Sequence, residues 1–302
     1  MTEQAPRRTS WRRTAWPWLL PVTAILALVL VYPLVDIVRL SFTNASLVSG
    51  EPYQATTGAY RSLVRGTDFQ QTMTVTFLFV LMSAVGQLVL GLGAALLVNG
   101  AARRGLRGSV LTRTTMMTAW AIPGVMIGVI WSLLLQESRS GIVNYSLSLL
   151  GFAGNTPFLS DPRWALASVT IANVWRGTAM SMILCYAGLK TIPADIYEAS
   201  TLDGAGHFQT LWRVTLPAMR AILLTNLILI VVETFNTFDM VLSLTGGGPG
   251  ESTEILPLAI YDAIFRQLDL GRGAAMAVVL VAVNLAMVAI YLRLNSRAER
   301  TA

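Results

Sequence analysis

The sequence predicts an all-α, polytopic membrane protein with six transmembrane helices. Of its 302 residues, 54% are hydrophobic and only 13% are charged, which lies far from the composition of a soluble globular domain. A helix needs about 20 apolar residues to cross a bilayer. Four runs of that length contain no charged side chain and predict four of the helices: Trp16–Val35, Thr72–Val98, Thr114–Gln136 and Gly273–Leu292.

Two further long apolar stretches contain charged residues. Residues 164–189 include Arg176, and residues 221–245 include Glu233 and Asp239. Such residues are tolerated in a membrane where they face protein or a water-filled path, so both stretches are counted as spans. The predicted spans cover about residues 16–40, 72–98, 112–136, 164–189, 219–245 and 273–294, joined by a cytoplasmic loop at 190–218 and flanked by tails at 1–15 and 295–302.

The cationic residues predict the orientation, because short cytoplasmic loops are rich in Lys and Arg. With the N-terminus inside, the cytoplasmic side contains Arg7, Arg8, Arg12, Arg13, Arg103, Arg104, Arg107, Arg113, Lys190, Arg213, Arg220, Arg293, Arg297 and Arg300. The external side contains half as many: Arg39, Arg61, Arg65, Arg139, Arg163, Arg266 and Arg272. Both termini are therefore predicted to be cytoplasmic, and the net charge of +6 is attributed to anchors at the lipid surface, with no nucleic-acid partner expected. The first apolar run is too long for a cleaved export signal, so we expect it to be retained.

Several kinds of active site are excluded by composition. With one histidine, His207, and one cysteine, Cys185, these residue types cannot assemble a metal site or a disulfide. A His-based triad is not expected either, because His207 lies in the predicted cytoplasmic segment, far in depth from the intramembrane acids. The only lysine, Lys190, lacks the glycines of a nucleotide-binding P-loop. The glycine run Thr245–Gly250 resembles a phosphate nest, but it follows a predicted span on the external side and is better explained as a turn. No catalytic residue, metal or cofactor is therefore predicted in this chain.

A polar segment, EASTLDGAGHFQTLWRVTLP at Glu198–Pro217, interrupts the apolar sequence on the predicted cytoplasmic side. Pro193 suits the first turn of a helix that can continue to Leu202. Residues Asp203–Gly206 break it, and a second helical piece follows at His207–Leu216. Neither piece is long enough to be stable alone in water. The segment could lie on the membrane surface, but its small side chains and few cations favour docking into a groove of another protein.

The residues of this segment resemble the EAA loop of binding-protein-dependent ABC importer permeases. The matching parts are Glu198-Ala199-Ser200, Asp203-Gly204-Ala205 and Leu216-Pro217. Ser200 and Val214 are mild departures from the usual alanine and isoleucine. The preceding GLKTIPADIYEAS resembles the carbohydrate importers of the MalF and SugA type. Other motifs resemble the same family in the same order over about residues 16–291: WAIPG (Trp120–Gly124), GIVNY (Gly141–Tyr145), FLSDP (Phe158–Pro162), LTGGGP (Leu244–Pro249) and LGRGAAMAV (Leu270–Val278).

The resemblance implies a type I ABC importer fold and the role of a permease subunit, not an enzyme, in a bacterial cytoplasmic (inner) membrane. Expected partners are a second permease subunit forming a heterodimer, two ATPase subunits that bind ATP and Mg²⁺, and an external solute-binding protein. The polar segment would be the coupling helix seated in the ATPase. Glu198 would pair with a basic ATPase side chain, Ala199 and Ser200 would allow close approach, and Gly204 and Gly206 would permit the reversal. The full set is Glu198, Ala199, Ser200, Asp203, Gly204, Ala205 and Gly206.

Polar residues inside the predicted spans are candidates for a solute pathway. Arg176 and Glu233 are predicted at equal depth, and two alternatives stay open: a buried ion pair, or groups that line a path. Glu233, Asn236 and Thr237 are predicted to share one helical face. The family resemblance implies a sugar site at seven positions: Asn173, Arg176, Gly177, Thr234, Thr237, Trp120 and Gly124. The Trp120 ring could pack on a sugar or serve only in packing. The complete predicted set is Trp120, Gly124, Asn173, Arg176, Gly177, Glu233, Thr234, Asn236, Thr237 and Asp239.

The solute is predicted to be a sugar, a disaccharide or oligosaccharide such as trehalose or maltose. Another small polar solute, such as glycerol phosphate, is the alternative. A secondary transporter would also contain intramembrane charges, but that class is built from repeats, and the six predicted spans show no clear duplication. A membrane-embedded enzyme is the least favoured class.

Overall fold

The structure is a computed structural model that describes residues 11–48, 53–106, 108–138, 141–152 and 155–300. Residues 1–10 and 301–302 of the two predicted tails lie outside the described residues. Within the described part, helices, turns and loops form the whole structure apart from two isolated β-bridges, Thr43 with Ala55 and Ser46 with Asp269. The predicted all-α class is confirmed.

The helices follow one another along the chain, with η denoting a π-helical turn. They are α1 (Trp11–Leu26), η1 (Ala27–Val31), α2 (Tyr32–Ser41), α3 (Gly58–Arg65), α4 (Thr67–Arg103), α5 (Ser109–Ala121), α6 (Gly124–Leu134), α7 (Ile142–Leu149), α8 (Pro162–Thr191), α9 (Ala194–Leu202), α10 (His207–Thr210), η2 (Leu211–Thr215), α11 (Leu216–Ala218), α12 (Arg220–Phe235), α13 (Asp239–Leu244), α14 (Leu256–Tyr261), η3 (Asp262–Arg266) and α15 (Leu270–Arg300).

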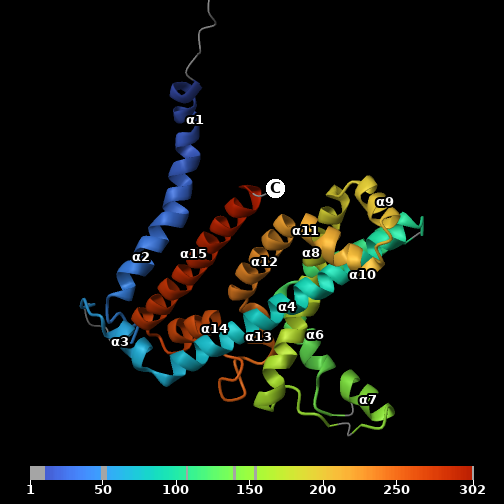
Figure 1. The fold of residues 1–302 in the computed structure, drawn as a ribbon. Coiled ribbons are helices and arrows are strands. Elements are labelled where there is room, and N and C mark those ends of the chain that lie inside the picture. Colours follow the sequence, from blue (N-terminus) through green and yellow to red (C-terminus); the bar gives the residue numbers. More distant parts are fainter. Residues whose placement is uncertain (1–10, 49–52, 107, 139–140, 153–154, 301–302) are drawn as a thin grey trace, which may run out of the picture.

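The helices α4 and α8 form the central pair of the molecule (Figure 1). Glycines on α4 permit their close approach, because a Cβ at Gly86 would run into Val174 and one at Gly91 would run into Ser181. Small residues at a helix interface are the usual way in which membrane helices pack. With 37 residues, α4 is about 55 Å long, so it extends well beyond a hydrocarbon layer of about 30 Å.

The predicted third span does not form one straight helix. Residues 112–136 divide into α5 and α6, whose axes are bent by 99°. Pro123 causes the break, since it has no N–H to donate and disfavours helical backbone at the residue before it. Ile122 is accordingly extended, with ψ of 130°.

The predicted fifth span is also broken. Within residues 219–245, α12 ends at Phe235 and α13 begins at Asp239. The Asn236 side chain donates to the carbonyl of Val232 at 2.7 Å, and the Thr237 hydroxyl donates to the carbonyl of Glu233 at 3.0 Å. These bonds satisfy carbonyls that would otherwise be free at a helix end.

Of the three π-helical turns in the described residues, η1 and η2 each lie just before a proline. Pro33 follows η1 and Pro217 follows η2. The proline ring collides with the carbonyl four residues earlier, and a wider turn relieves that collision. The first span thus remains helical from Trp11 to Ser41 with one bulge.

Within the described residues, three helical segments are long and apolar enough to cross a membrane: Trp18–Ser41, Thr67–Arg103 and Leu270–Asn295. The number rises to five if the bent pairs α5 with α6 and α10–α11 with α12 each count as one span. The 30-residue α8 has the length but is not among these segments. The six-span count and the cytoplasmic termini therefore remain predictions. Figure 1 shows the start of α1, the end of α15 and α9 toward the same end of the molecule.

Candidate functional site

The first junction in the predicted pathway joins Gly124 and Asp239. Gly124 is the first residue of α6 after the Pro123 break, and Asp239 is the first residue of α13. A Cβ at Gly124 would overlap the Asp239 carboxylate, and one at Gly128 would overlap the Ser243 hydroxyl. The two broken helices thus pack together through glycines, and they place a carboxylate beside a helix start.

The second junction joins α4, α8 and α12 around a buried amide. Asn173, 4% exposed, points its side-chain nitrogen at the hydroxyl of Thr234, 2% exposed, at 3.4 Å. Gln87 of α4 donates to the carbonyl of Asn173 at 3.4 Å. Gln87 also lies directly against Gly177, where a Cβ would collide with its amide. The structure therefore brings Asn173, Gly177 and Thr234 together and adds Gln87.

Arg176 and Glu233 do not form the ion pair that was one of the two alternatives. The salt bridges within the described residues are Asp36–Arg39 at 3.8 Å and Asp262–Arg266 at 3.1 Å. Arg176 is half-buried, and its Nε is buried without a hydrogen-bond partner in the described part of the chain. Glu233 is exposed. Arg176 on α8 and Glu233 on α12 therefore do not form a salt bridge in this structure.

The remaining pathway residues are spread around the break after α12. Asn236 and Thr237 follow the end of α12. Contrary to the prediction, they therefore do not share a helical face with Glu233. Asn236 donates instead to Asn284 of α15 at 3.3 Å, while Thr237 is buried. Trp120 lies near the end of α5 and is 37% exposed.

The predicted coupling loop forms two short helical pieces. Its first piece is α9, with Pro193 at the N-cap, and the second is α10 continued by η2. Gly204 between them has a φ of +72°, which favours glycine. Gly206 is the N-cap of α10 with an ordinary φ of −69°. The reversal therefore requires Gly204, whereas Gly206 is not needed for it.

The side chains of the loop divide into an outer and an inner set. Glu198, Ala199 and Asp203 are exposed. Ser200 is buried instead, and its hydroxyl bonds to that of Thr210 at 3.0 Å, so it joins the two pieces. A groove of about 590 Å³ runs along the loop and is lined by Ile196, Ala199, Ser200, Asp203, Ala205, Gln209, Arg213 and Val214.

Two site residues were missed by sequence reasoning. Gln87 lies in the run Thr72–Val98 and Asn284 in the run Gly273–Leu292, and neither run contains a charged residue. Amides in the middle of an apolar run are costly in lipid and indicate contacts with other polar groups. That signal was present in the sequence for both residues.

The fold defines a multi-pass membrane protein with a separate helical loop beside its central helix pair, and comparison with known proteins places it in a family. Residues 87–300 match the family described as binding-protein-dependent transport system inner membrane component. The chain belongs to this family, and it is a transport subunit and not an enzyme.

Relatives match the chain over nearly its whole length. It is 35% identical to the sulfoquinovosyl glycerol transport system permease protein SmoG of Agrobacterium fabrum, over 97% of this chain and 95% of SmoG. It is 28% identical to the trehalose/maltose transport system permease protein MalF of Thermococcus litoralis, over 92% of each chain. A chain from the crystal structure of a bacterial ABC transporter that imports alginate has a TM-score of 0.80 and 20% identity, covering 94% of this chain and 96% of that one. This last similarity confirms the ABC importer permease fold.

Proposed function

We propose that this chain is the permease subunit of an ATP-driven importer for a sugar, as a disaccharide or oligosaccharide. The observation that carries the proposal is the arrangement along α4. Gln87, midway along this helix, contacts Asn173 and Gly177, and Arg103, at its end, contacts Tyr197 of the coupling loop. Polar groups suited to sugar hydroxyls and the predicted ATPase contact are thus connected through one rigid element.

Curated relatives support a polyhydroxyl solute. Their names refer to sulfoquinovosyl glycerol, trehalose/maltose and diacetylchitobiose. The pathway groups that we expect to contact the solute are the Asn173–Thr234–Gln87 cluster and the Gly124–Asp239 junction. Trehalose and maltose are the substrates to test first.

A second candidate solute is an anionic polyol such as glycerol phosphate. Arg176 favours it, because a half-buried guanidinium without a carboxylate partner in the described residues would suit a phosphate or sulfonate group. A relative named sn-glycerol-3-phosphate transport system permease protein UgpA, from Brucella abortus, is 30% identical over 78% of this chain.

The exposed pathway residues support a second permease subunit. Glu233, Asn236 and Trp120 are exposed in the single chain, so one side of the proposed path is open. A second permease, expected as a different chain, would complete it. An external binding protein would deliver the solute, and ATP and Mg²⁺ would be bound by two ATPase subunits. Movement of the coupling loop on ATP binding would then switch the access of the path between the two sides of the membrane.

Affinity purification of the tagged full-length chain tests this proposal. We expect an ATPase with a Walker motif to co-purify, and the chain to restore uptake of one labelled solute in a deletion strain. The panel would contain trehalose, maltose, other disaccharides and glycerol 3-phosphate. Uptake without any co-purifying ATPase would instead indicate a secondary transporter.

A further inference from the structure

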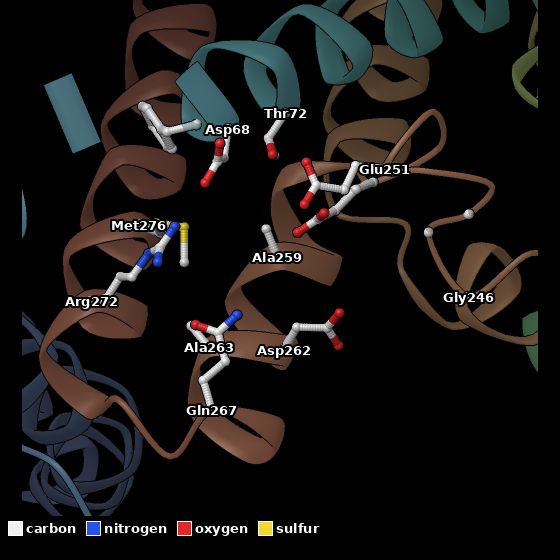
Figure 2. A pocket seen from close by; sticks show the side chains of 14 residues that line it. Asp68, Thr72, Gly246, Glu251, Ala259, Asp262, Ala263, Gln267, Arg272 and Met276 are labelled. Carbon is white, nitrogen blue, oxygen red and sulfur yellow. The ribbon is translucent and has the colours of Figure 1, made fainter. Parts of the chain in front are cut away.

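A polar pocket lies where the start of α4, the loop after α13, α14–η3 and the start of α15 meet (Figure 2). Its volume is about 320 Å³. We call it the acidic pocket and define it by six of its lining residues: Asp68, Thr72, Glu251, Glu254, Asp262 and Arg272. None of them belongs to the predicted pathway or to the coupling loop.

The acidic pocket and the coupling loop lie at opposite ends of α4. Asp68 is in the first turn of this helix and Arg103 is in its last turn, against Tyr197 of the loop. The intervening residues span roughly 50 Å at 1.5 Å per residue, which exceeds a hydrocarbon thickness of about 30 Å. With the coupling loop in the cytoplasm, the pocket opens on the external side.

The charge of the pocket is strongly unbalanced. It contains four carboxylates and one guanidinium, from Arg272. Burial raises the pKa of Glu254, and the neighbouring charge of Glu251 raises it further. Burial also raises the pKa of Asp262, whose Oδ1 is buried without a hydrogen-bond partner while its Oδ2 accepts from Arg266. A cationic group in the pocket would stabilise the ionised form of these carboxylates.

A hydroxyl in the pocket also lacks a partner. Thr72 is 5% exposed, and its oxygen points into the pocket between Asp68 and Glu251 (Figure 2). In the described part of the chain this hydroxyl has no hydrogen-bond partner. Facing the pocket, the hydroxyl is free to accept a hydrogen bond from a ligand that brings N–H donors.

The shape of the cluster argues against a single metal ion. Among the described residues no three Asp, Glu, His or Cys side chains converge closely enough to hold one. An ammonium or guanidinium group at the end of a flexible side chain presents several N–H donors, which can meet separate carboxylates and the Thr72 hydroxyl. We propose that the acidic pocket receives a Lys or Arg side chain of the solute-binding protein when that protein docks.

This inference rests on the proposed function, which supplies a protein partner on the external side. The pocket also lies beside a contact through which docking would affect α4. The backbone N–H of Leu256, at the start of α14, donates to the Thr76 hydroxyl of α4 at 2.9 Å in a buried position. A side chain seated between α14 and α4 would therefore act on the helix that contacts both the pathway and the coupling loop.

The test uses the whole transporter in nanodiscs, with its co-purified ATPase and the solute-binding protein that stimulates it. The ATPase rate is measured against binding-protein concentration. The double variant E251Q/E254Q should raise the half-maximal concentration about tenfold, because opposite charges at an interface promote encounter and fix register, and saturating binding protein should restore the maximal rate. The variant T72V should raise the half-maximal concentration by a smaller factor. The control D36N removes a carboxylate that lies outside the pocket and is paired with Arg39. It should leave the half-maximal concentration unchanged.

An unchanged half-maximal concentration in E251Q/E254Q would overturn the inference. A second result would also overturn the inference: loss of labelled spermidine binding in this variant while docking of the binding protein stays normal. That result would show a site for small cations. A charge reversal, Glu254→Lys, that is rescued by reversing one Lys or Arg of the binding protein would support the inference directly. If the wild-type complex shows no stimulated hydrolysis at all, the proposed function fails first.

Discussion

The guanidinium of Arg103 lies over the ring of Tyr197, with its Cζ 4.2 Å from the ring centroid. Arg103 is in the last turn of α4, and Tyr197 is in the middle of α9. Tyr197 also packs against a buried cluster near the C-terminal ends of α4 and α8, which includes Ala95, Leu189 and Met219. The coupling loop is therefore attached to the central helix pair, and movement of α9 has a direct path to α4.

Replacing Arg103 by alanine is expected to weaken coupling. A cation over an aromatic ring contributes about 0.5–1 kcal/mol at an exposed site, so the number of solute molecules transported per ATP should fall roughly two- to fivefold. The measurement is uptake and ATP hydrolysis in the same proteoliposomes. Arg104→Ala is the matched control, since this neighbouring cation has no ring contact in the described residues. Equal losses in both variants would contradict a specific role for Arg103.

Replacing Gly124 by alanine is expected to reduce uptake strongly while the protein still reaches the membrane. The added methyl group would overlap the Asp239 carboxylate, and overpacking of this kind costs about 1–3 kcal/mol. Gly93→Ala is the control, because a Cβ there meets nothing within 4 Å. Labelled-solute uptake, normalised to protein in the membrane, makes the comparison. Full uptake in the Gly124 variant would show that the α6–α13 junction is adaptable.

Replacing Arg176 by alanine is expected to lower uptake more than it lowers the amount of protein. The described residues provide no ion pair with Glu233 whose loss could unfold the bundle, so the effect should appear in solute binding. Glu233→Gln should not reproduce it. The measurement is the solute concentration that half-saturates uptake, beside the amount of protein in the membrane. The Arg176 variant, the Glu233 variant and the double variant could instead all lose the same amount of uptake. That result would indicate that the two residues pair in another state of the transporter.

Some parts of the fold could be predicted because their cause is local in sequence. The runs Thr72–Val98 and Gly273–Leu292 lie within α4 and α15, since apolar length needs no knowledge of the partner helix. The break at Asp203–Gly206 between the pieces of the coupling loop is likewise caused by residues that disfavour a helix wherever they occur. The Pro123 break could have been predicted in the same way.

Other parts depend on how the helices meet. The end of α12 at Phe235 is made by side-chain bonds of Asn236 and Thr237 to carbonyls of the preceding turn, in a stretch without proline or glycine. The contact of Gln87 with Gly177 depends on the register of α4 against α8. Apolar periodicity does not determine such a register, and for the same reason it left open whether Arg176 and Glu233 pair or line a path.

The carboxylate of Glu137 is expected to stabilise the loop before α8 in a pH-dependent way. The Ser160 hydroxyl donates to it at 2.6 Å, and the backbone N–H groups of Leu159 and Ser160 donate at 3.0 and 2.7 Å. The Ser160 hydroxyl bond, assisted by these N–H groups, lowers the pKa of Glu137. Its contribution to stability is therefore present above the unfolded-state pKa and is lost as the pH falls through the lowered folded-state pKa.

Thermal unfolding of the wild type and of Glu137→Gln measures this contribution. The wild type should unfold at a slightly higher temperature at neutral pH, and the difference should vanish in acid. The shift should be small, since the carboxylate is partly solvated. A difference that persists below the folded-state pKa would mean that the carboxylate charge is not its source.

Replacing Gly204 by valine is expected to uncouple transport from ATP hydrolysis. Its φ of +72° costs a β-branched residue on the order of 1–3 kcal/mol, while open space around the Cβ position leaves the backbone as the only source of strain. The strain would turn α9 relative to α10 and so displace Glu198 from any partner groove. Gly204→Asn should be milder, because asparagine tolerates this region of backbone conformation, and Gly206→Ala, at an ordinary φ, should be nearly neutral. The measurements are co-purification of the ATPase and solute transported per ATP. Normal coupling in Gly204→Val, with the complex assembled, would show that the conformation of this turn does not set the ATPase contact.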